Sequence, residues 1–118
     1  ICGPWYDPEK EAAFMHSTKT QTDDIRIPDS TWRVEIVFDS TSKNDINRIT
    51  EGTTLVAINV PNTSTCYSDA RSEGYSEKTS WQHYITTVDE IEELTGLDFF
   101  ANLPDEVEDV LESRRYVP

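Results

Sequence analysis

The sequence predicts an α+β domain in which the strands of an antiparallel sheet come first and two helices come last. Three observations predict it: an alternating apolar pattern at 31–38, an apolar run at 53–60, and two amphipathic segments after residue 86. Strands followed by helices are typical of α+β architecture. The length of 118 residues favours a single domain spanning 1–118, since domains cluster near ~100–150 residues.

The strands follow from residue alternation and from the residues that end them. The opening Ile1-Cys2-Gly3-Pro4 is interpreted as the tail of a strand, cut through its middle, that runs into a Gly-Pro turn. In 31–38 the side chains of Trp32, Val34, Ile36 and Phe38 share one face, which predicts a half-buried strand. The run 53–60 is almost continuously apolar and closes on Pro-Asn, so we expect a strand covered on both faces.

Two helices are expected near the end of the chain. Thr87 and Glu90 have the spacing of a capping box, and Gly96 is placed to end that helix. A last helix is expected from Pro104, with Val107, Val110 and Leu111 buried and Arg114-Arg115 at its negative end. The polar stretches 39–50 and 62–80 are expected to be loops, and 81–85 a short strand or extended lead-in.

The charge balance limits the functions that this surface can serve. Ten Lys and Arg face 23 Asp and Glu, which gives a net charge of −13. Gripping nucleic-acid phosphates requires clustered Lys and Arg, so this surface alone is a poor candidate for it. Apolar runs stay well short of the ~20 residues that span a bilayer, so no membrane partner is expected. Cys2 and Cys66 allow one disulfide without requiring it.

Individual polar residues give little indication of chemistry by themselves. His16 has no acidic or cysteine neighbour at metal-ligand spacing, and His83 has no nucleophile placed beside it by a motif. Residues 86–118 hold ten acids and two bases, a net charge of −8. Their acids fall largely between apolar residues, so we expect a solvated helix surface rather than a metal site.

Several blocks, taken together, resemble the C-terminal half of the DNA/RNA non-specific endonucleases, the ββα-metal nucleases. They occur in the family's order: Ile1-Cys2-Gly3-Pro4, the segment 27–38 that begins Ile-Pro-Asp-Ser-Thr-Trp-Arg, the strand 54–62 that closes on Pro-Asn, and 81–100. The most specific element is Leu94-Thr95-Gly96, followed by Asp98-Phe99. The blocks span nearly the whole chain.

The resemblance implies metal-assisted hydrolysis of phosphodiester bonds in single- and double-stranded DNA and RNA. In the family a histidine within an Asp-Arg-Gly-His motif is the general base, and an asparagine on a following helix holds one hydrated Mg²⁺. That motif does not occur in this chain. No catalytic, metal-binding or cofactor residue is therefore assigned here, and Asn59 and Asn62 are not given the Mg²⁺ role. Secreted or periplasmic location would be typical of the family.

The expectation is thus the supporting, C-terminal portion of an Mg²⁺-dependent endonuclease, inactive alone, with base and metal contributed by residues upstream. A sheet cut in this way leaves an open edge, so its own N-terminal half or a second copy is the expected partner. The alternative is a non-catalytic acidic module that binds a basic protein through its net charge.

Overall fold

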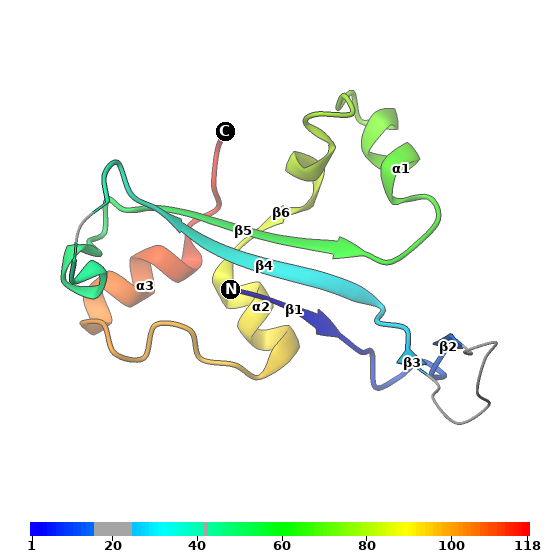
Figure 1. The fold of residues 1–118 in the computed structure, drawn as a ribbon, viewed down its shortest axis with the longest axis horizontal. Coiled ribbons are helices and arrows are strands. Elements are labelled where there is room, and N and C mark those ends of the chain that lie inside the picture. Colours follow the sequence, from blue (N-terminus) through cyan, green and yellow to red (C-terminus); the bar gives the residue numbers. More distant parts are fainter. Residues whose placement is uncertain (16–24, 42) are drawn as a thin grey trace.

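A four-stranded antiparallel sheet, ordered β1-β4-β5-β6, organises the computed structural model, which describes residues 1–15, 25–41 and 43–118 (Figure 1). A two-stranded antiparallel pair, β2-β3, lies beside it. The strands are β1 (Cys2–Trp5), β2 (Phe14–Met15), β3 (Ile25–Arg26), β4 (Ser30–Val37), β5 (Thr54–Pro61) and β6 (Ile85–Thr86). The helices are η1 (Asp45–Arg48), α1 (Cys66–Ser72), η2 (Ser80–Tyr84), α2 (Val88–Thr95) and α3 (Asp105–Ser113). The predicted α+β class, strands first and helices last, is confirmed.

The two long strands match their predicted ranges to within a residue. β4 and β5 pair over eight positions, from Ser30 opposite Pro61 to Val37 opposite Thr54. Trp32 and Val34 point into the core, as the alternation predicts. On β5, Leu55 and Ala57 are buried, while Val56 and Ile58 on the other face are only half-buried. The expectation that both faces of this strand are covered therefore holds fully for one face only.

The core forms where α2 packs on one face of the sheet. Trp32 and Val34 from β4, and Leu55 and Ala57 from β5, meet two apolar side chains of α2. Those two residues, Val88 and Ile91, are almost completely buried. The ring of Phe99 meets Trp32 edge-on, with centroids 5.4 Å apart. α3 packs against α2 on the same side of the sheet (Figure 1).

The capping box of α2 is confirmed in detail. Thr87 is the N-cap and accepts a hydrogen bond from the Glu90 amide, while the Glu90 carboxylate accepts one from the Thr87 amide. Gly96 ends the helix in the left-handed conformation at φ 72°, where a residue without Cβ is favoured.

Several local expectations are wrong. The stretch 39–50, expected to be a loop, contains the helical turn η1. Gly3 and Pro4 lie inside β1, paired with Trp32 and Thr31, and do not form a turn. The stretch 62–80 contains α1, and 81–85 begins as the helical turn η2 before entering β6. On α3, Val110 is exposed rather than buried.

Cys2 and Cys66 are free thiols. None of the described helices has the length and apolar content that a bilayer crossing requires.

Candidate functional site

The histidine of the described residues is held by aromatic rings. His83 lies on η2, half-buried, with its ring centroid 4.8 Å from that of Tyr84 and 5.7 Å from that of Tyr75. The Tyr84 hydroxyl donates to the Cys66 carbonyl, which ties η2 to α1. His83 is thus packed as part of this aromatic group. His16 lies outside the described residues.

The two asparagines at the end of β5 have structural surroundings. Asn62 donates through Nδ2 to the Pro28 carbonyl at 3.0 Å, and its amide donates to the Asp29 carbonyl at 2.8 Å. These bonds fasten the end of β5 to the turn before β4. Asn59 lies opposite Trp32 in the sheet, and its Oδ1 is buried without a hydrogen-bond partner among the described residues.

Most basic side chains of the described residues are engaged inside the chain. The guanidinium of Arg26 lies 4.7 Å from the ring centroid of Tyr6, and that of Arg48 lies 4.6 Å from the ring centroid of Phe38. Arg114 donates to backbone carbonyls before β5. Because these cations already have partners, the described surface does not present the clustered basic groups that phosphate binding needs.

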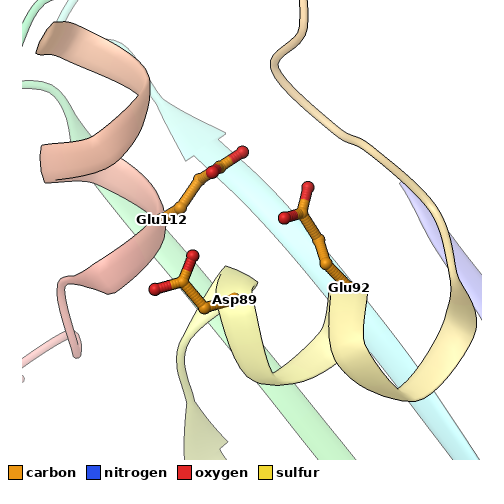
Figure 2. Close-up of side chains that lie close together, drawn as sticks. All are labelled: Asp89, Glu92 and Glu112. Carbon is orange, nitrogen blue, oxygen red and sulfur yellow. The ribbon is translucent and has the colours of Figure 1, made fainter. Parts of the chain in front are cut away.

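Acidic side chains converge instead, between α2 and α3. Asp89, Glu92 and Glu112 each place a carboxylate oxygen within 4.8 Å of the others. Figure 2 shows the three side chains near one another, two from α2 and one from α3. We call these three residues the carboxylate cluster. A second group of Asp98, Glu108 and Glu112 meets the same distance limit and shares Glu112 with the first.

Local structure fixes the two residues that α2 contributes. The capping box starts the helix at Val88, so Asp89 lies in its first turn and Glu92 lies one turn further on the same side. The Oε1 atom of Glu92 accepts a hydrogen bond of 2.7 Å from the amide of Phe99. This bond uses only Oε1, so the other carboxylate oxygen of Glu92 can interact with groups on α3.

Glu112 is the buried member of the cluster. Only 7% of Glu112 is exposed to solvent, and its Oε1 has no hydrogen-bond partner among the described residues. The pKa of Glu112 is raised to about 7, mainly by burial and in smaller part by the negative charges of Glu92, Glu108 and Asp89 and by a hydrogen bond with Glu92. Burial is likewise the largest of the effects that raise the pKa of Glu108, ahead of four neighbouring acids.

The expectation that the acids of 86–118 form a solvated helix surface is therefore wrong at Glu112. In α3, Leu111 and Glu112 are buried and Val110 is exposed. The sequence holds only a weak signal for this: Glu108 and Glu112 are four residues apart and so lie on one side of the helix. The sequence pattern favoured a different buried face. Val107, Val110 and Leu111 define a face of α3 that is rotated by about a quarter-turn from the face that is buried.

This arrangement does not fit the catalytic magnesium centre that the family resemblance implies. That centre needs a histidine base beside an asparagine ligand, whereas His83 packs between tyrosine rings and the Asn62 amide binds a carbonyl. The carboxylate cluster contains neither residue type. Chemically, it can hold a proton or a cation, but it offers no general base beside a nucleophile.

Comparison with known proteins places these observations in context. A model of the DNA/RNA non-specific endonuclease family matches residues 1–106 of the chain. A protein named Nuclease, from Nostoc sp. strain PCC 7120, is 32% identical over 90 residues, which cover 76% of this chain and 28% of that protein. The matched part of the chain thus corresponds to little more than a quarter of the relative's length. Glu108 and Glu112 lie beyond the residues that the family model matches.

Proposed function

Because the chain belongs to the DNA/RNA non-specific endonuclease family, we propose that it forms the C-terminal portion of an Mg²⁺-dependent endonuclease. The enzyme hydrolyses phosphodiester bonds in DNA and RNA with little sequence preference. Its general base and metal ligand come from residues upstream of this chain. Residues 1–118 form one partial domain that supports that catalytic portion and are inactive by themselves.

The observation that carries this proposal is the family match to a chain that lacks the family's catalytic motif. The 118 residues match the family over most of their length, and they contain no Asp-Arg-Gly-His. The alignment to the Nostoc nuclease covers 28% of that protein, so there is ample room in such a protein for a catalytic portion. The acidic charge of −13 then describes the supporting part, while the basic phosphate-facing groups belong to the rest.

The open edge of the sheet supports the same proposal. Among the described residues, β1 pairs with β4 on one side only. Beside it lies a groove of about 630 Å³ whose apolar lining includes Ile1, Val34, Ile36 and Phe99. The radius of gyration is 17.2 Å, whereas a compact domain of this length has ~13–14 Å. An unpaired edge beside apolar surface is suited to further strands and a further layer.

A plasmid-nicking assay tests whether the chain is inactive alone and whether cleavage requires the upstream residues. The purified chain is incubated with supercoiled plasmid and Mg²⁺, and we expect no nicking above the level of a chelator control. A longer protein that includes the upstream coding sequence is expected to cut both DNA and RNA when Mg²⁺ is present. Mg²⁺-dependent nicking by the chain alone, retained through stringent purification, would refute the proposed inactivity.

The upstream sequence provides a second and independent check. We expect an Asp-Arg-Gly-His motif in the coding region before Ile1, and replacing its histidine with alanine should abolish cleavage by the longer protein. A coding region without that motif would remove the proposed catalytic portion. Sedimentation of the chain alone at high concentration tests the open edge, because we expect self-association there, and a folded monomer would count against it.

A further inference from the structure

We propose that the carboxylate cluster of Asp89, Glu92 and Glu112 binds a calcium ion that joins α2 to α3. This site is separate from the catalytic magnesium of the proposed enzyme and does not depend on the proposed function. Its role is structural, because it holds the last helix of the chain on the helix that covers the sheet.

The spacing of the three carboxylates suits a calcium ion. Calcium–oxygen bonds of ~2.3–2.6 Å place two ligand oxygens at most ~5 Å apart. The three oxygens of the cluster lie within 4.8 Å of one another, which is inside that limit. Magnesium demands near-octahedral geometry and keeps several of its waters, so it is seldom held by a set of protein carboxylates alone, whereas calcium accepts such a set.

Glu112 is the observation that points to a ligand rather than to a solvated acidic surface. Only 7% of the residue is exposed, its Oε1 has no hydrogen-bond partner among the described residues, and its carboxylate lies within 4.8 Å of those of Asp89 and Glu92. A buried carboxylate costs several kcal/mol unless a proton, a cation or hydrogen bonds compensate it. A divalent cation in this space would compensate all three carboxylates together.

The charged groups that act on the two glutamates of α3, Glu112 and Glu108, are all negative. The charged groups that act on Glu112 are Glu92, Glu108 and Asp89, and those that act on Glu108 are Asp98, Asp105, Glu92 and Asp109. The segment 86–118 as a whole carries a net charge of −8. Such a concentration of charge raises the local concentration of divalent cations and strengthens the binding of one that is directly coordinated.

The neighbouring acids can complete the coordination. Calcium takes 6–8 oxygen ligands and accepts water among them. Asp98 and Glu108 share Glu112 with the cluster, and the Glu92 carboxylate is already fixed by its bond to the Phe99 amide. One ion would therefore have ligands from α2, from the connection after it and from α3, and would link these three segments.

Calorimetric titration of the chelator-stripped chain with CaCl₂, at about pH 8, tests the proposal. We expect one saturable site per chain and a rise in melting temperature of ~5 °C or more at saturating calcium. Glu112→Gln should weaken calcium binding by at least ~10-fold, because it removes one ligand charge and keeps the shape. MgCl₂ should bind more weakly than CaCl₂.

Glu106→Gln is the matched control, since Glu106 lies on the same helix, is exposed and belongs to neither carboxylate group. It should bind calcium as the unmodified chain does. Equal calcium affinity in Glu112→Gln and Glu106→Gln would overturn the proposal, as would non-saturable binding of several ions. Magnesium binding as tight as calcium binding would overturn the assignment of calcium.

Discussion

Gly3 of β1 lies so close to the indole of Trp32 on β4 that no side chain fits between them. A Cβ at residue 3 would be 2.6 Å from the Cζ2 atom of Trp32. The two residues are partners in the sheet register, and Trp32 is only 6% exposed in the core. The glycine therefore allows a large aromatic ring to lie close against an edge strand, and its role is to permit this close approach rather than to form a turn.

We expect Gly3→Ala to destabilise the chain by ~1–3 kcal/mol, because the added methyl group displaces Trp32 or separates β1 from β4. Urea denaturation monitored by tryptophan fluorescence measures the change. Gly52→Ala is the control, since the nearest atom to its Cβ would be Thr50 Oγ1 at 3.8 Å, and it should change stability by less than ~0.5 kcal/mol. Both variants lose the same backbone freedom when unfolded, so equal effects would contradict the close-approach argument.

The capping box of α2 gives a second prediction. Thr87→Ala removes the hydroxyl that accepts the Glu90 amide at 3.2 Å, and should cost ~0.5–2 kcal/mol in the free energy of unfolding. Thr87→Ser keeps the acceptor and should recover most of the loss. Thr41→Ala, an exposed threonine outside the helices and strands, is the control and should be nearly neutral. A loss in Thr87→Ser as large as in Thr87→Ala would mean that the methyl group, not the cap, is responsible.

Elements whose signals are local were predictable from the sequence. The alternation at 31–38 predicts β4 to within a residue. The capping residues Thr87 and Glu90 and the terminating Gly96 likewise predict α2, and the structure has both elements. α1 and η2 were not predictable in this way, because the sequence of 62–80 is polar and rich in turn residues. They are held by tertiary contacts: Ala70 is completely buried, and the Tyr84 hydroxyl bonds the Cys66 carbonyl.

The candidate site was missed for a related reason. The rotation of α3 about its axis depends on how Leu111 packs, and that rotation decides whether Glu112 or Val110 is buried. Three apolar residues on a nine-residue helix do not fix this rotation by themselves. The convergence of Glu112 with Asp89 and Glu92 also needs the packing of two helices, which no motif in the sequence encodes.

Arg114 gives a third prediction, because its observed partners differ from the expected ones. Its guanidinium donates to the Glu51 carbonyl at 2.6 Å and to the Thr53 carbonyl, and so joins the end of α3 to the start of β5. Arg114→Ala should cost ~1–3 kcal/mol, as expected for charged hydrogen bonds. Arg115→Ala should cost much less. If both arginines acted only on the helix dipole, as their positions suggest, the two variants would lose similar, salt-sensitive amounts, and that result would contradict the bridging role.

Glu112 should make the stability of the calcium-free chain fall as the pH rises. Its carboxyl, with the pKa raised from 4.5 to about 7, binds a proton more tightly in the folded chain than in the unfolded one. Stability is therefore lost as the pH rises from about 4.5 through about 7, and the loss is complete above that range. Glu112→Gln mimics the protonated form, so in a chelator it should match the unmodified chain near pH 4 and be more stable by ~1–3 kcal/mol at pH 8. Urea denaturation at both pH values measures this, with Glu106→Gln as the control that should keep the original pH dependence. A pH dependence unchanged by Glu112→Gln would show that other groups titrate, and that Glu112 is ionised in the folded chain throughout.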